Sequence, residues 1–100
     1  MSNFDDKSLY SRGLEFYKKN QLDSSLNFLM RVENKDLDTL KLISQIHIKK
    51  TNFDNAKTFL SEILSLDKKN LFALNSLGDL NKIEKNFVNA EKYYLKSISL

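Results

Sequence analysis

Apolar residues recur along the chain at spacings of three and four residues, which is the period of an amphipathic helix. Short polar stretches interrupt this pattern and divide the chain into six segments. At a rise of 1.5 Å per residue, six helices of about 12–15 residues, each roughly 20 Å long, would account for the chain. The interruptions fall at residues 19–21, 34–36, 50–52, 67–70 and 83–86.

Four short polar residues stand directly before apolar segments and are predicted to cap the helices that follow. Their side chains can accept a hydrogen bond from a free amide of the first helical turn. The predicted caps are Asp36, Asn52, Asn70 and Asn86.

The last two pairs of segments repeat each other. Residues 52–66 align with residues 86–100 at one constant offset, which places Ala56 on Ala90. A constant offset of about 34 residues is the sequence signature of a repeat architecture.

An earlier and shorter copy precedes these two. Residues 22–29 align with residues 53–60, with Ser25 on Ala56, and this offset is three positions shorter than the later one. The missing positions are predicted to fall in the connection 32–37, where one helix ends early.

Small residues recur at two places in each copy. Two helices packed 8–10 Å apart need small side chains where their backbones approach most closely. We therefore predict a close crossing in each pair, where a larger residue would destabilise the protein by roughly 1–3 kcal/mol. The small residues are Gly13, Ser44 and Gly78 in the first helices and Ser25, Ala56 and Ala90 in the second.

This arrangement resembles the tetratricopeptide repeat, which shows Trp-x2-Leu-Gly-x2-Tyr, then Ala-x3-Phe and Pro within one repeat period. The sequence departs from that signature at Arg12, at Asn81 and in its missing prolines. An unrelated helical bundle would share the three-and-four spacing but not small residues at a fixed distance. The matching residues of the last copy are Leu74, Leu77, Gly78, Asn81, Ala90 and Tyr94.

The resemblance implies an all-α solenoid of about three helix-turn-helix repeats, with six helices in a right-handed superhelix. It implies a single domain over residues 1–100, with repeats at about 6–35, 37–70 and 71–100. In such a solenoid each repeat buries its apolar face only against its neighbours.

Charge and composition narrow the possible partners. The 16 basic and 13 acidic residues are interspersed and leave a net charge of +3, so no nucleic-acid partner is expected. No apolar run approaches the length that spans a membrane, so no membrane partner is expected either. The N-terminus is acidic where a secretory signal would be basic, which favours a cytoplasmic location.

Catalytic chemistry is not expected. The chain has no cysteine and one histidine, which excludes thiolate nucleophiles, Cys ligands and a His–His metal pair within the chain. We expect His47 to pack inside the structure, and the isolated Gly13 and Gly78 do not form a phosphate loop. The sequence therefore predicts no enzyme, no cofactor and no metal site.

The resemblance implies a function in protein binding. The first helix of each repeat would line a concave groove that holds a peptide or helix of a partner. Tyr10, Tyr17 and Phe72 would act as anchors, and the groove lysines would favour acidic partners. The groove residues are Tyr10, Leu14, Tyr17, Lys18, Lys41, Gln45, Lys49, Phe72, Asn75, Asp79 and Lys82, joined by Lys7, Ser11, Asp38, Leu42, Ile48, Ser76 and Ile83.

The clamp that chaperone-binding members use for a C-terminal carboxylate is absent from the groove. Its Lys, Arg and Asn positions are filled here by other residue types, so the tails of the large chaperones are not expected partners. Those positions hold Tyr10, Leu14, Leu42, Phe72 and Ser76.

Three alternatives to peptide binding stay open at this point. The groove residues could form an ordinary solvated face of a spacer. The repeats could instead be the N-terminal segment of a larger enzyme, such as a glycosyl- or sulfotransferase, or an oligomerising structural module. The last helix presents Tyr94, Ile98 and Leu100, and we expect either a continuation of the chain or another chain to cover that edge.

Overall fold

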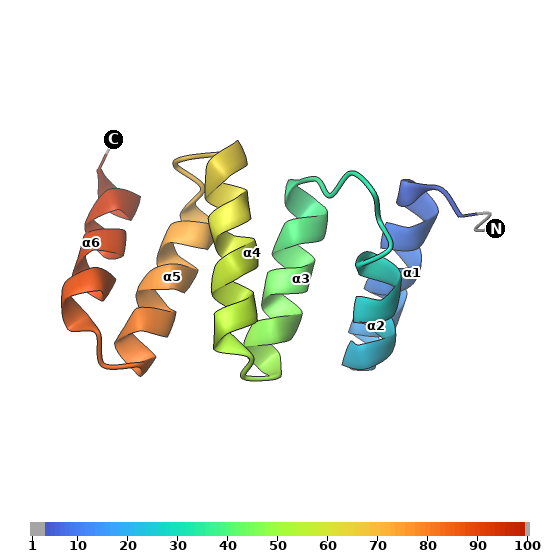
Figure 1. Ribbon diagram of the computed structural model, residues 1–100, viewed down its shortest axis with the longest axis horizontal. Coiled ribbons are helices and arrows are strands. Elements are labelled where there is room, and N and C mark those ends of the chain that lie inside the picture. The colour runs from blue at the N-terminus through green and yellow to red at the C-terminus, as the bar shows by residue number, and fades with distance from the viewer. Residues whose placement is uncertain (1–3, 100) are drawn as a thin grey trace.

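Within residues 4–99, six α-helices stand side by side in a single row (Figure 1). The computed structural model describes residues 4–99, and no strand occurs among them. The row measures 46 × 26 × 19 Å, so it is elongated, and the predicted all-α fold is confirmed. The helices are α1 (Asp6–Lys18), α2 (Leu22–Leu29), α3 (Leu37–Lys49), α4 (Phe53–Leu66), α5 (Leu71–Ile83) and α6 (Phe87–Ile98).

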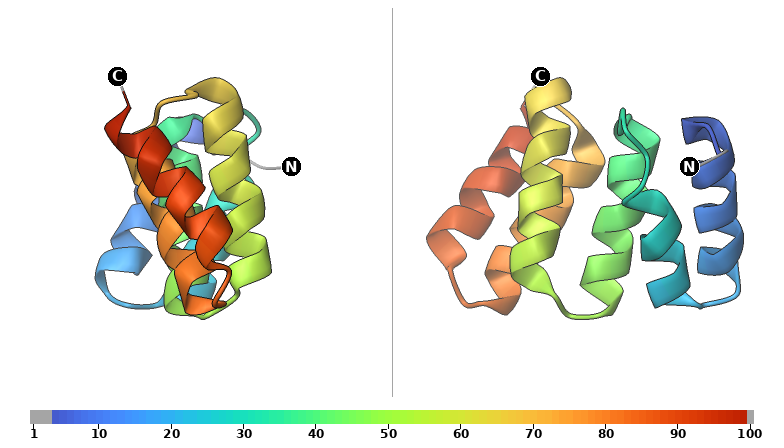
Figure 2. Two further views of the ribbon diagram at one scale, coloured as in Figure 1. Left: turned by 90° about the vertical axis from the view of Figure 1, so that its left-hand side faces the viewer. Right: turned by 45° about the vertical axis from the view of Figure 1, so that its right-hand side comes forward.

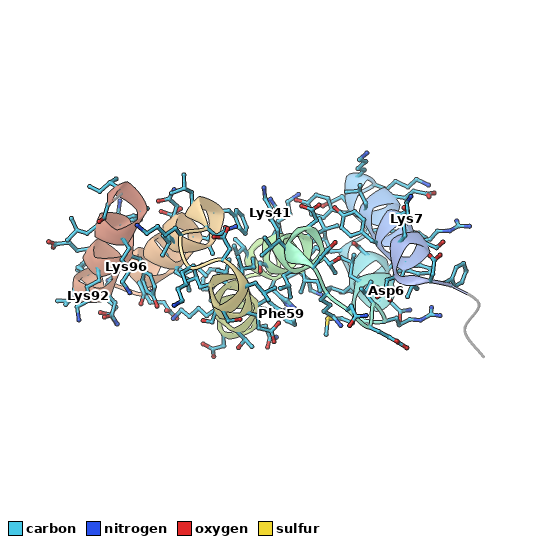
Figure 3. The ribbon with its side chains drawn as sticks, turned by 90° about the horizontal axis from the view of Figure 1, so that it is seen from above. Asp6, Lys7, Lys41, Phe59, Lys92 and Lys96 are labelled. Atoms are coloured by element: carbon cyan, nitrogen blue, oxygen red, sulfur yellow. The ribbon has the colours of Figure 1, made fainter. Side chains whose placement is uncertain are left out.

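Consecutive helices form three antiparallel hairpins, α1 with α2, α3 with α4, and α5 with α6 (Figure 2). Viewed from above, α1, α3 and α5 lie toward one side of the row, and α2 and α4 lie toward the other (Figure 3). The first helices of the hairpins therefore share one face of the molecule.

The predicted N-caps stand where the helices begin. The side chains of Asp36, Asn70 and Asn86 each accept a hydrogen bond from the backbone amide three residues further on. Asp5 caps α1 in the same way. Asn52 has the predicted place before α4 but makes no such bond.

The turn of each hairpin contains one residue whose backbone is in the left-handed helical conformation, with a positive φ angle. Asn20, Thr51 and Lys85 have φ angles of 58°, 59° and 63°. In each turn the next backbone amide donates to the carbonyl oxygen five residues earlier, which is the Schellman arrangement that ends a helix. These turns recur at the same two offsets as the repeat itself.

The turn conformation predicts a gain in stability from glycine. Thr51→Gly should raise the free energy of unfolding by about 0.5–1 kcal/mol, because a β-branched residue is strained at positive φ. Urea unfolding followed by circular dichroism measures the change. The matched control is Thr58→Gly within α4, which should lower stability by about 1 kcal/mol. A Thr51→Gly variant less stable than the wild type would contradict the prediction.

The apolar core follows the row of helices. One cluster joins α2 to α3 through Leu29, Ile43 and Ile46. A second cluster joins α3, α4 and α5 and includes Leu60 and Leu77. Each of these inner helices is therefore buried between its neighbours, as expected for a solenoid.

The predicted close crossing is present in the first hairpin. The Ser25 hydroxyl donates to the Gly13 carbonyl oxygen at 2.6 Å. A Cβ atom on Gly13 would lie 2.5 Å from Cδ2 of Leu29, which is fully buried. In the last hairpin a Cβ atom on Gly78 would meet the ring of Tyr94 at the same distance.

The middle hairpin keeps small residues at the same places. Ser44 and Ala56 are both fully buried. The Ser44 hydroxyl donates to the carbonyl oxygen of Leu40 in its own helix at 2.8 Å. The buried Ser44 hydroxyl is therefore hydrogen-bonded where the two helices cross.

A methyl group at the crossing of the first hairpin is expected to destabilise the protein. Gly13→Ala should lower the free energy of unfolding by about 1–2 kcal/mol, because overpacking outweighs the gain in helix propensity. Ser11→Ala, at an exposed position of the same helix, is the matched control and should leave stability unchanged or slightly raised. Thermal unfolding of both variants measures the difference. Equal stability of the two variants would mean that the helices can separate at Gly13 without cost.

The first repeat is short because α2 ends early. α2 has 8 residues where α4 has 14, so the predicted length of 12–15 residues is wrong for α2, while the predicted early end of this helix is confirmed. The carboxylate of Asp6 accepts hydrogen bonds from the backbone amides of Glu33 and Asn34 at 2.9 and 3.0 Å. These bonds, the one from Asn34 first, lower the pKa of Asp6 below its ordinary value. The connection is thus tied to the start of α1 in place of further helical turns.

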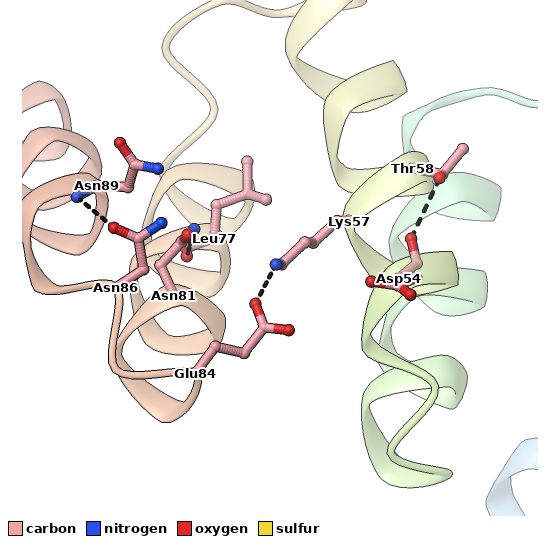
Figure 4. A network of polar contacts seen from close by, with 8 residues as sticks. All are labelled: Asp54, Lys57, Thr58, Leu77, Asn81, Glu84, Asn86 and Asn89. Atoms are coloured by element: carbon pink, nitrogen blue, oxygen red, sulfur yellow. Dashed lines mark hydrogen bonds and ion pairs between the residues drawn. The ribbon is translucent and has the colours of Figure 1, made fainter.

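Two ion pairs join successive hairpins. Lys50, the C-cap of α3, pairs with Asp23 of α2. Glu84, the C-cap of α5, pairs with Lys57 of α4 (Figure 4). In both cases the end of a first helix meets the second helix of the preceding hairpin, and the charges are reversed between the two junctions.

Candidate functional site

The predicted groove residues all belong to α1, α3 and α5. Lys41 projects from α3 on the side opposite Phe59 of α4 (Figure 3). Most of the polar members are exposed, and Gln45 is half-buried. The exposed polar members are Lys7, Ser11, Lys18, Asp38, Lys41, Lys49, Asn75, Asp79 and Lys82.

The prediction is wrong for Leu42, which is buried with only 4% of its surface exposed. Leu42 belongs to the core cluster of α2 and α3, and the side chains of Tyr10, Leu14 and Tyr17 pack against that cluster. The physical reason is that α1 packs against α3 at this point. The two tyrosines are therefore half-buried and seal the junction between α1 and α3.

Two lysines of α3 cover aromatic rings of the neighbouring first helices. The Lys49 Nζ atom lies 4.6 Å from the ring centre of Tyr17 on α1. The Lys41 Nζ atom lies 5.1 Å from the ring centre of Phe72 on α5. A cation–π contact at an exposed site contributes about 0.5–1 kcal/mol. The lysine side chains thus tie α3 to both neighbours, and two of the predicted anchors each carry a cation.

The electrostatic character of this face is positive. Five lysines stand against two aspartates, Asp38 and Asp79, among the predicted groove residues. Asp79 is held by the Tyr94 hydroxyl of α6, which donates to it at 2.5 Å, and this bond raises the pKa of Tyr94. Burial raises the pKa of Tyr10, with Asp38 and Asp36 contributing further.

His47 is a packing residue, as predicted. It is buried and stacks on Phe59 with ring centres 5.7 Å apart and planes at 7°. The first repeat has the same stack between Phe16 and Phe28, at 5.5 Å and 8°. The Nδ1 atom of His47 is buried and has no hydrogen-bond partner among the described residues.

The third repeat has no ring at the position of His47. Asn81 occupies it, is buried, and donates a hydrogen bond from its side-chain amide to the carbonyl oxygen of Leu77 at 2.8 Å (Figure 4). The polar side chain is thus satisfied within its own helix.

Stability should depend on pH through His47. Burial first, and then Lys50, lowers the pKa of His47 below its ordinary 6.5. The unfolded chain therefore binds the proton more tightly than the folded chain, and stability is lost as pH falls below about 6.5. Urea unfolding at pH 7 and pH 5 measures this loss.

His47→Phe should remove that pH dependence. It should also raise stability at pH 7 by about 1 kcal/mol, because the unpaired buried nitrogen is gone. The expected variant keeps nearly the same free energy of unfolding at both pH values. An equal loss in wild type and variant would assign the pH dependence to other groups.

Residues 4–99 contain no cluster of three or more His, Asp or Glu side chains that could hold a metal ion. None of the helices in that range is long and apolar enough to cross a membrane.

Sequence reasoning missed a depression at the C-terminal end of the row. It has a volume of about 510 Å³ and is formed by α5 and α6. Two predicted groove residues, Asn75 and Lys82, lie at it, together with Tyr94 and Ile98 of the predicted open edge. Leu100, the third residue of that edge, lies outside the described residues.

Helical hairpins stacked in one row, with the same close crossing and the same turn in each copy, define a helical-repeat protein. Residues 38–70, which span nearly all of α3 and the whole of α4, match the family model of the tetratricopeptide repeat. No curated protein matches the chain. Tetratricopeptide repeats generally mediate protein–protein interactions and are typically non-catalytic.

Proposed function

We propose that the chain is a scaffold that binds an acidic peptide segment of a partner protein on the face formed by α1, α3 and α5. The domain would consist of three repeats, at about 6–35, 37–70 and 71–100. The observation that carries the proposal is the pair Lys41 and Lys49, each positioned over an aromatic ring. An aromatic ring beside a cation can contact a partner protein through apolar area and through positive charge at the same point.

The spacing of the two lysines sets the length of the segment. They are eight residues apart on α3, which corresponds to about 12 Å along the helix axis. An extended peptide advances about 3.3 Å per residue, so acidic side chains about four residues apart would reach both lysines. Exposed Lys7, Lys18 and Lys82 extend the positive charge along α1 and α5.

The aromatic residues would supply the remaining affinity. Tyr17 and Phe72 are half-buried, so their exposed ring edges are held rigidly by the packing beneath them. A rigid aromatic anchor loses little conformational entropy on binding. An apolar side chain of the peptide could displace a lysine from its ring while the lysine turns to a carboxylate.

Charge reversal tests this proposal without removing the packed rings. Peptides selected from a random library for binding to the protein should be rich in Asp and Glu. The double variant Lys41→Glu and Lys49→Glu should bind them at least ten times more weakly, by isothermal titration, and the wild-type affinity should fall with added salt.

The matched control is the double variant Lys68→Glu and Lys69→Glu. It changes the net charge by the same amount in the loop between α4 and α5, and it should keep the wild-type affinity. If both double variants bound the peptides equally weakly, the loss of affinity would be explained by the change in net charge alone, which would contradict the proposal. Nuclear magnetic resonance shifts confined to α2, α4 and α6 would place the peptide elsewhere and overturn the proposal.

A further inference from the structure

The outward face of α6 exposes a row of apolar side chains. Phe87, Leu95 and Ile98 are 61%, 53% and 75% exposed. They lie at the depression between α5 and α6, with Glu91 in the same depression. In the left view of Figure 2, α6 faces the viewer and no other described helix lies in front of it.

The repeat itself shows what covers such a face. The offset between the last two copies places Phe87 on Phe53 and Tyr94 on Leu60 of α4. Leu60 is fully buried and Phe53 packs against the same cluster, to which α5 contributes Leu77. α5 therefore covers this face of α4, whereas no described helix covers the equivalent face of α6.

The charge of Glu91 adds a second requirement for a helix that covers α6. Glu91 occupies the position that Lys57 has in α4. Lys57 pairs with Glu84 at the C-terminal end of the helix that covers it. A helix that covers α6 in the same way would bring its own C-terminal end to Glu91, and a basic residue there would restore the pair.

We propose that this face binds an amphipathic α-helix of a partner protein, in the way that α4 binds α5. The helix would present an apolar stripe to Tyr94 and Ile98, which correspond to Leu60 and Leu64 of α4, and a Lys or Arg in its last turn to Glu91. This surface shares Asn75 and Lys82 of α5 with the peptide face, but its apolar side chains and Glu91 belong to α6, so the inference does not depend on the function proposed above.

A second copy of this chain does not supply such a helix from its N-terminal end. Where α5 has Leu77 and Leu80 facing α4, the equivalent positions of α1 hold Arg12 and Glu15. Stacking α1 of another copy on α6 would bury these two charged side chains against apolar surface, which is costly.

A peptide copied from the chain tests the proposal. The probe is residues 70–86 with Glu84→Lys and blocked ends, and the reference is the same peptide with Glu84 unchanged. The probe should bind at least five times more tightly than the reference, by fluorescence anisotropy, and should shift resonances of α6. Circular dichroism checks that each protein variant keeps its helices.

Charge reversal on the protein should invert this preference. Glu91→Lys should bind the reference peptide more tightly than the probe, while Glu62→Lys, an exposed control on α4, should keep the wild-type order. Ile98→Lys should abolish binding of both peptides.

Three results would overturn the proposal. The first is the same order of affinities in Glu91→Lys as in the wild type, and the second is a set of resonance shifts on α4 in place of α6. The third is a stable dimer in sedimentation that Ile98→Lys dissociates, which would make the face an interface between copies.

Discussion

The close crossing of two helices within each hairpin is the constraint on which the rest of the structure depends. At Gly13 the partner helix is near enough for the Ser25 hydroxyl to reach the backbone carbonyl, and Leu29 fills the space that a Cβ atom would need. Because each hairpin is closed on itself in this way, its remaining apolar side chains can be buried only against the next hairpin. The result is a row of helices with a core that runs along it.

This geometry also determines where surface is left for a partner. α3 has neighbours on both sides along the row and α4 behind it, so only one side of the helix reaches solvent. On that side Lys41 and Lys49 cover the rings of Phe72 and Tyr17. The same contacts that hold the first helices together therefore give their shared face its positive charge and its aromatic edges.

Much of this fold could be predicted from the sequence, because its signals are local or strictly periodic. The cap residues Asp36 and Asn70 stand directly before apolar segments, and their bonds form within one turn. The small residues at the crossings repeat at a fixed distance. Both kinds of signal can be recognised in the sequence without knowledge of the tertiary structure.

The features that the sequence analysis missed depend instead on contacts between distant segments or on an uncommon residue choice. The left-handed turns at Thr51 and Lys85 lack the glycine that usually reveals them. Leu42 has the spacing of a groove residue, but α1 covers it, which only the packing of whole helices decides.

The two ends of the row meet the same packing problem differently. At the outer face of α1, Arg12 and Glu15 take positions that are apolar in α3 and α5, so that face is polar and solvated. At α6 the apolar residues are kept, and Ile98 is 75% exposed. Lys82 belongs both to the shared face of the first helices and to the depression beside α6. A helix bound to α6 would therefore lie next to the end of a peptide on that shared face, and binding at either surface would change the electrostatic environment of the other.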